Sequence, residues 1–100
     1  MNILSGSISA SAPQQASVAN SSTTIVVENL QRVGLVLMNL SAGTIYLGIN
    51  NTAILGSGIT LLPDGGVWTM DEYNFVKEQI NAIAHSSGSL LSIQEFVVRS

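Results

Sequence analysis

The chain has 100 residues, of which 46% are apolar and only 9% are charged, with six acids, three bases and no cysteine. This length bounds a single domain, and the lack of cysteine, together with a single histidine, excludes disulfides and a zinc site. Three scattered bases cannot neutralise a run of phosphates, and no apolar run approaches the ~20 residues of a membrane-spanning helix, so we expect neither nucleic acid nor membrane as a partner.

Residues 1–23 form a compositional unit rich in Ser, Ala, Gln and Asn. Large apolar residues are too sparse there for a core element, so this unit is predicted to be an extended N-terminal arm, followed by one domain over residues 24–100. Ile3, Leu4 and Ile8 are placed to pair with another surface as an added strand. The alternative is a disordered tail. The segment lacks a basic n-region and an apolar h-region, so we expect no signal peptide.

Strand signals follow in close succession after the arm. Runs of β-branched and apolar residues predict strands over 24–28, 33–40, 44–50, 59–62, 67–70 and 90–98. A tight turn over 41–43 joins the two central strands, and further turns are predicted at Asn50–Asn51 and Pro63–Gly66. The spacing of these signals predicts an all-β protein built as an antiparallel β-sandwich.

Two details of the second half need the structure to decide them. Residues 71–87 begin with an acidic N-cap, carry an apolar stripe and precede a glycine, which favours a helix on periodicity. The surrounding strands favour instead a strand near 79–84. In the last strand the apolar parity changes partway along, which predicts a bulge near Gln94–Glu95.

The strand predicted over 33–40 is apolar on both faces, which is typical of a strand covered on both sides. A domain this small can hardly bury both faces by itself, so we expect a partner surface to cover one of them. A surface of Ser, Thr and Asn in place of charges also costs little to desolvate, which favours a permanently assembled protein. The candidate contact residues are Ile3, Leu4, Ile8, Val36, Met38 and Leu40.

No arrangement of residues points to catalysis. His85 lies in a polar HSSG turn without a G-x-S-x-G elbow, so a solvated turn residue fits this position better than the base of a hydrolase. Asp71 and Glu72 are adjacent and would point to opposite faces of a strand, and the acids form no calcium-loop pattern. We therefore expect a protein that is not an enzyme, with no metal and no cofactor.

The order of the sequence motifs can be compared with that of known families. RVGLVLMNLS at 32–41 is followed by TIYLGI, GITLLPDGG, VWTM, INAIA and finally LSIQEF. Over roughly residues 32–98 this order resembles the small β-sandwich proteins on the virions of tailed bacteriophages, particularly capsid decoration or cement proteins. The resemblance implies a jelly-roll-like sandwich, commonly a homotrimer, that binds between subunits of the major capsid protein. It implies no catalytic residues.

The expected function is therefore that of a virion structural protein that stabilises the phage head. It would assemble in the bacterial cytoplasm and remain on the capsid surface. The alternative is a receptor- or glycan-binding module of a phage fibre or tail, which would use Tyr46, Trp68 or Tyr73. An exposed aromatic groove would favour this alternative, whereas apolar edges at a three-fold axis would favour decoration.

Overall fold

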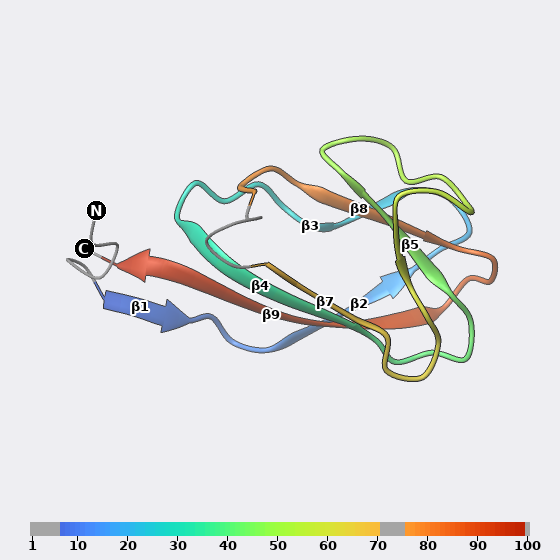
Figure 1. Ribbon diagram of the computed structural model, residues 1–100, viewed down its shortest axis with the longest axis horizontal. Coiled ribbons are helices and arrows are strands. Elements are labelled where there is room, and N and C mark those ends of the chain that lie inside the picture. The colour runs from blue at the N-terminus through green and yellow to red at the C-terminus, as the bar shows by residue number, and fades with distance from the viewer. Residues whose placement is uncertain (1–6, 71–75, 100) are drawn as a thin grey trace.

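The computed structural model describes residues 7–70 and 76–99 and consists of two antiparallel sheets packed face to face (Figure 1). Sheet A contains, on one edge, both β1 (Ser7–Ala10) and β2 (Gln14–Val18), then β9 (Ser89–Arg99), β4 (Arg32–Asn39) and β7 (Val67–Met70). Sheet B contains β3 (Thr23–Val26), β8 (Ile80–Ala84), β5 (Ile45–Ile49) and β6 (Ile59–Leu61). The predicted all-β, antiparallel sandwich is confirmed.

The strand order shows how the chain passes between the two sheets. Sheet A runs β2-β9-β4-β7 and sheet B runs β3-β8-β5-β6, so most consecutive strands lie in opposite sheets. Eight strands that alternate between two sheets in this way form a jelly roll. This topology agrees with the fold that the sequence resemblance implies.

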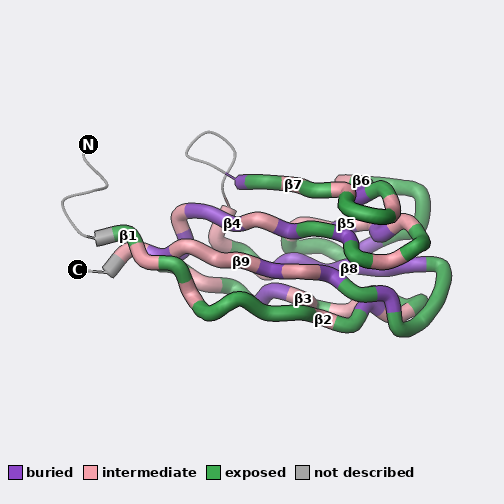
Figure 2. The backbone as a smooth tube through the Cα atoms, turned by 90° about the horizontal axis from the view of Figure 1, so that it is seen from below, coloured by how far each residue is buried: buried purple, intermediate pink, exposed green. Residues whose placement is uncertain are grey.

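The core lies between the inner faces of the two sheets. From Leu35 to Asn39 of β4 the buried and less buried residues alternate (Figure 2), because successive side chains of a strand point to opposite faces. Fully or almost fully buried side chains from both sheets meet there, among them Val18, Leu35, Leu37, Ile45, Ile80 and Leu91. Burying a side chain of this size stabilises the fold by ~1.5–3 kcal/mol.

Residues 7–18 belong to sheet A and not to a separate arm. β1 and β2 both pair with β9, and Val18 at the end of β2 is completely buried. Pro13 separates the two strands, because proline has no N–H to donate to the ladder. The predicted domain boundary after residue 23 therefore does not separate residues 7–18 from the sandwich. These residues are held by backbone pairing, which the amino-acid composition does not reveal. Ile3 and Leu4 lie outside the described residues.

The turn after β4 carries the chain from sheet A to sheet B, so β4 and β5 do not pair with each other. Asn39, which is completely buried, holds this corner. Its Nδ2 donates to the carbonyls of Gly43 at 2.8 Å and Leu61 at 3.0 Å, and its Oδ1 accepts from the N–H and the hydroxyl of Ser41. These four bonds occupy the whole amide, which is why a polar side chain can be buried here.

The structure decides both open details of the second half. Residues 80–84 are a strand with all five residues buried, so the helical interpretation is wrong there, while residues 71–75 lie outside the described part. The bulge predicted near Gln94–Glu95 is also wrong, because β9 keeps one register with β4 from Phe96 to Leu91. The parity change has another cause: Glu95 occupies an inward position, and the outward positions beyond it are apolar.

Candidate functional site

The described residues do not bring together a set of acidic and imidazole side chains that could bind a metal ion. No group of three or more His, Asp or Glu side chains in residues 7–70 and 76–99 is close enough together to hold a metal ion. Asp71 and Glu72, considered above as an acidic pair, lie outside the described residues. No helix in the described part of the chain is long and apolar enough to cross a membrane.

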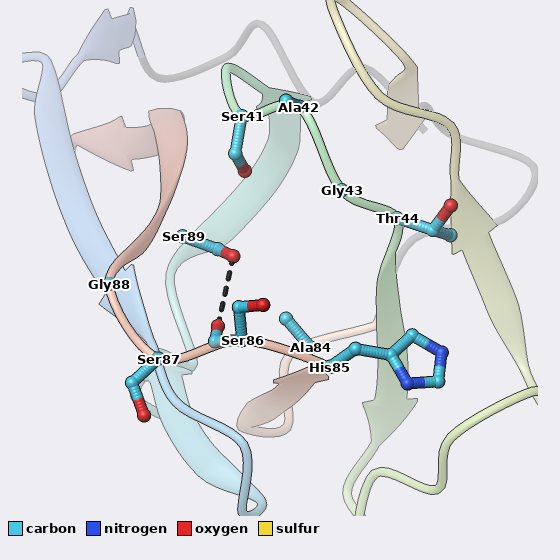
Figure 3. Close-up of a pocket in the computed structure, with 10 residues that line it drawn as sticks. All are labelled: Ser41, Ala42, Gly43, Thr44, Ala84, His85, Ser86, Ser87, Gly88 and Ser89. Carbon is cyan, nitrogen blue, oxygen red and sulfur yellow. Dashed lines mark hydrogen bonds between the residues drawn. The ribbon is translucent and has the colours of Figure 1, made fainter.

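A shallow hollow of about 340 Å³ lies between the turn after β4 and the turn after β8 (Figure 3). Residues 41–44 and 84–89 line it with small side chains, hydroxyls and one imidazole. The hydroxyl of Ser89 donates to the carbonyl of Ser86 at 3.1 Å and so closes the second turn on itself. No Asp, Glu, Lys or Arg side chain lines the hollow.

His85 is an exposed turn residue, as the sequence predicts. Its ring meets the ring of Tyr46 edge to face, with centroids 5.9 Å apart and planes at 82°. In Figure 3 the imidazole points away from Ser86 and Ser89. A serine nucleophile needs a base within hydrogen-bond reach, and the geometry of this turn does not supply that pair.

The aromatic residues proposed for glycan binding are dispersed. Trp68 is half-buried on β7 and packs against the core. Tyr46 is half-buried on β5, where its nearest aromatic contact is His85. Tyr73 lies outside the described residues. Within the described part of the chain these side chains do not form an aromatic groove.

The predicted contact residues Val36 and Met38 point outward from sheet A. Their cross-strand partners are Gln94 and Ser92 on β9, and paired residues of an antiparallel ladder point to the same face. Met38 is 36% exposed, and Leu40, one residue beyond β4, is 44% exposed. The outer side of this strand is therefore partly open in the single chain, and its cover by a partner surface stays a prediction.

This open side extends over all five strands of sheet A. We call it the outer face, defined by the positions that alternate with the buried ones in the registers of these strands. None of its residues is charged: they are Ile8, Ala10, Gln15, Ser17, Gly34, Val36, Met38, Val67, Thr69, Leu90, Ser92, Gln94, Phe96 and Val98.

Ile8 joins the outer face from β1, where it pairs with Val98 and is 40% exposed. Sequence reasoning missed Val67 and Leu90, which are 52% and 41% exposed on the same face. The alternation of side chains along their strands determines which face each residue occupies. That face can be assigned to the outside of sheet A only when the pairing of these strands with their neighbours is known. The face therefore unites three of the predicted contact residues with neighbours from distant parts of the sequence.

Sheet B, in contrast, has part of its outer side covered. Asn81 and Ile83 point outward there but are only 7% and 9% exposed, and the loop over residues 50–58 lies against Asn81. The Nδ2 of Asn81 donates to the carbonyl of Asn51 at 2.6 Å and ties the loop to the sheet. A side chain at Gly48 would put its Cβ 2.6 Å from that same carbonyl oxygen, so glycine is required under the loop.

Sequence reasoning also missed the role of Arg32, which is buried. Its side chain is completely buried and its Nε donates to Glu95 Oε2 at 2.7 Å. The remaining guanidinium nitrogens donate to the carbonyls of Val27, Val76 and Glu78 at 2.6–3.0 Å. Arg32 thus joins the loop before β4, the segment before β8 and β9, and it is a structural group that contributes no exposed charge.

Comparison with known proteins gives a likeness of fold. No protein family and no curated protein matches the sequence. One solved structure that is similar is a chain from Bacillus endospore appendages, which are described as a family of disulfide-linked pili. The match has a TM-score of 0.59 at 10% sequence identity and covers 95% of this chain and 91% of the other. At this identity the likeness establishes the jelly-roll sandwich and nothing about the partner.

Proposed function

We propose that this chain is a structural subunit that works as part of an assembly and catalyses no reaction. The observation that carries the proposal is the uncharged outer face of sheet A, which stays open in a chain whose loop over residues 50–58 covers part of the other sheet. Exposed apolar residues gathered on one face are typical of a surface that contacts another protein. The similar structure of a pilus subunit supports a building role in general terms.

The first form of this proposal is a decoration protein of a tailed-phage head. It rests on the order of sequence motifs over residues 32–98 and names the major capsid protein as the partner. The protein would sit on the capsid surface as a small oligomer, and neutral contacts repeated over the shell would add up through multivalency. The trimeric state implied by the resemblance belongs to this form of the proposal.

The second form is the subunit of an extracellular filament, which the fold similarity to the endospore appendages favours. Those appendages are described as disulfide-linked, but this chain has no cysteine. A filament built from it would therefore be held by non-covalent contacts alone. Such a filament would come apart in denaturant without a reducing agent.

The test separates the two forms. The gene for this chain is deleted from the genome that encodes it, and phage heads that lack the protein are prepared. The purified protein is then added to these heads at limiting concentration. Co-sedimentation to a saturating ratio supports decoration, whereas filaments of the protein alone under the electron microscope support the second form. Decoration is contradicted if the protein neither binds heads nor polymerises, or if the genome has no capsid genes. Both forms are contradicted if the protein is a monomer in every condition.

A further inference from the structure

We propose that the outer face of sheet A is covered by the same face of a second copy of this chain, related to the first by a two-fold axis. The inference rests on the proposed function for the premise that the chain acts in an assembly. It deepens that function by naming the contact surface and its occupant.

The absence of charge on the outer face fits a contact of the chain with itself. In a two-fold contact, residues near the axis meet their own copies, so any charge there would face a like charge. The chain carries a net charge of −3, yet the fourteen positions of the face hold no charged residue. A partner chosen by opposite charge would call for acids or bases on this face. The face is therefore complementary to itself and has no charged feature that would select a basic or an acidic partner.

The size of the face is close to what a stable dimer needs. β9 spans 11 residues, which at ~3.4 Å per residue gives a length of roughly 37 Å. Four strands side by side at ~4.8 Å give a width of roughly 19 Å, and hence at most about 700 Å². A standard interface buries ~800 Å² on each partner. Two such faces can pack as aligned sheets ~10 Å apart, with neutral side chains between them.

The terminal part of sheet A gives an independent reason for a cover. Beyond the pair Arg32–Val97, β1 is the one described strand that pairs with β9, besides a bond from the Val98 N–H to the Gln31 carbonyl at 2.9 Å, and Figure 1 shows β1 and β9 projecting past the rest of the sandwich. A two-stranded ribbon alone is marginally stable in water. The outward pair of this ribbon is Ile8–Val98, and the next outward pair along β1 is Ala10–Phe96, where Phe96 also pairs with Gly34 of β4; the four residues of these two β1–β9 pairs are all apolar. They continue the outer face, so one second copy covers the ribbon and the sheet together.

The first experiment measures association of the full chain by sedimentation equilibrium. We expect a species of about twice 10.5 kDa at micromolar concentration. Met38→Lys puts a charge in the middle of the face and should weaken association at least 100-fold. The control Ile54→Lys adds the same charge to an exposed apolar residue, 61% exposed, on the loop over sheet B and should leave association unchanged. Far-UV circular dichroism and the melting temperature verify that both variants fold.

The second experiment uses the absence of cysteine in the chain. Single cysteines at Ser92, Gln94 or Met38 lie near the centre of the face, and a disulfide forms only when two Cα atoms come within ~4.4–6.8 Å. At least one of the three variants should form a covalent dimer under mild oxidation, whereas Ile54→Cys should not.

Three outcomes overturn the inference: a wild-type monomer, a wild-type trimer of the kind that the decoration form implies, or an oligomer that Met38→Lys leaves intact. Equal cross-linking of all four cysteines also overturns it. A folded monomer that still binds heads or joins filaments refutes the self-contact while the proposed function stands. A wild-type protein that neither dimerises, nor binds heads, nor forms filaments refutes the proposed function itself.

Discussion

Replacing Arg32 by methionine tests whether one buried guanidinium holds the open end of the sandwich together. Methionine keeps the length and apolar stem of the side chain but removes all of its donors. The change leaves the carboxylate of Glu95 at a site where its side chain is only 19% exposed, without its cation. It also removes the donor from the carbonyls of Val27, Val76 and Glu78.

The expected loss follows from these contacts. Removing one partner of a buried ion pair costs ~3–5 kcal/mol, because the other charge stays in a poorly hydrated place. A domain of this size has a free energy of unfolding of ~5–15 kcal/mol, so this single change should remove a large part of it. Arg32→Lys should fall in between, since an ammonium keeps the charge but cannot reach four acceptors in the fork geometry of arginine.

The assay is urea unfolding followed by far-UV circular dichroism at one fixed protein concentration, because association adds to apparent stability. With a slope of ~1–2 kcal/mol/M for a small domain, a loss of ~3–5 kcal/mol should lower the midpoint of Arg32→Met by roughly 1.5–5 M. Lys77→Met is the matched control, since it removes an equal charge from a more exposed site at the same end and should cost less than ~1 kcal/mol. A midpoint for Arg32→Met within about 0.5 M of wild type, or equal losses in both variants, would refute the reasoning.

Three further predictions concern how the sandwich closes, each measured as the shift in the unfolding midpoint. Gly48→Ala should cost ~1–3 kcal/mol, because its Cβ would lie 2.6 Å from a carbonyl oxygen, whereas Gly43→Ala has nothing within 4 Å and should be neutral. Asn39→Leu should cost ~1–3 kcal/mol, because it leaves buried backbone groups at the corner unpaired; a neutral result would show that water replaces the amide. Val18→Ala should cost ~2 kcal/mol through the cavity that it opens, against less than ~0.5 kcal/mol for Val27→Ala, which is 71% exposed; equal losses would mean that β2 is not anchored in the core.

The sequence predicts those elements whose side chains carry the structure. Runs of β-branched and apolar residues mark the positions of β4, β5, β6, β7 and β9 to within a residue or two at each end. The turn at Asn50 was predicted from its tolerance of left-handed backbone, and its φ is 56°. These features depend on local steric preferences, which the identity of one or two residues determines.

Features that depend on contacts between distant segments could not be predicted in the same way. β1 and β2 are held by the backbone of β9, and backbone groups are alike in every sequence. Arg32 looks like a surface base until folding brings its acceptors from three separate segments around it. The amphipathic stripe over 71–87 has helical period, but the buried strand over 80–84 shows that tertiary pairing overrides such a pattern.

The candidate contact surface lies between these two cases. Val36 and Met38 were predicted because apolar residues on both parities of one strand require two covers. The neutral polar part of the same face, including Ser92 and Gln94, gives no signal by itself, since such residues are common on any surface. It becomes informative only through the register of β9 with β4, which places them beside the apolar residues and shows that the whole face lacks charge.

The low charge of the chain and the openness of sheet A have one physical connection. Soluble domains typically carry about a quarter charged residues, and this chain has nine in 100, two of which neutralise each other in the pair of Arg32 and Glu95. Of the other charged side chains that the structure describes, Glu28, Asp64 and Glu78 are exposed and Lys77 is half-buried. A free monomer with so few charges and an open apolar face would associate without a preferred geometry. On the proposed contact face, each uncharged polar group costs little to desolvate, so a contact there meets less opposition than one at a charged surface.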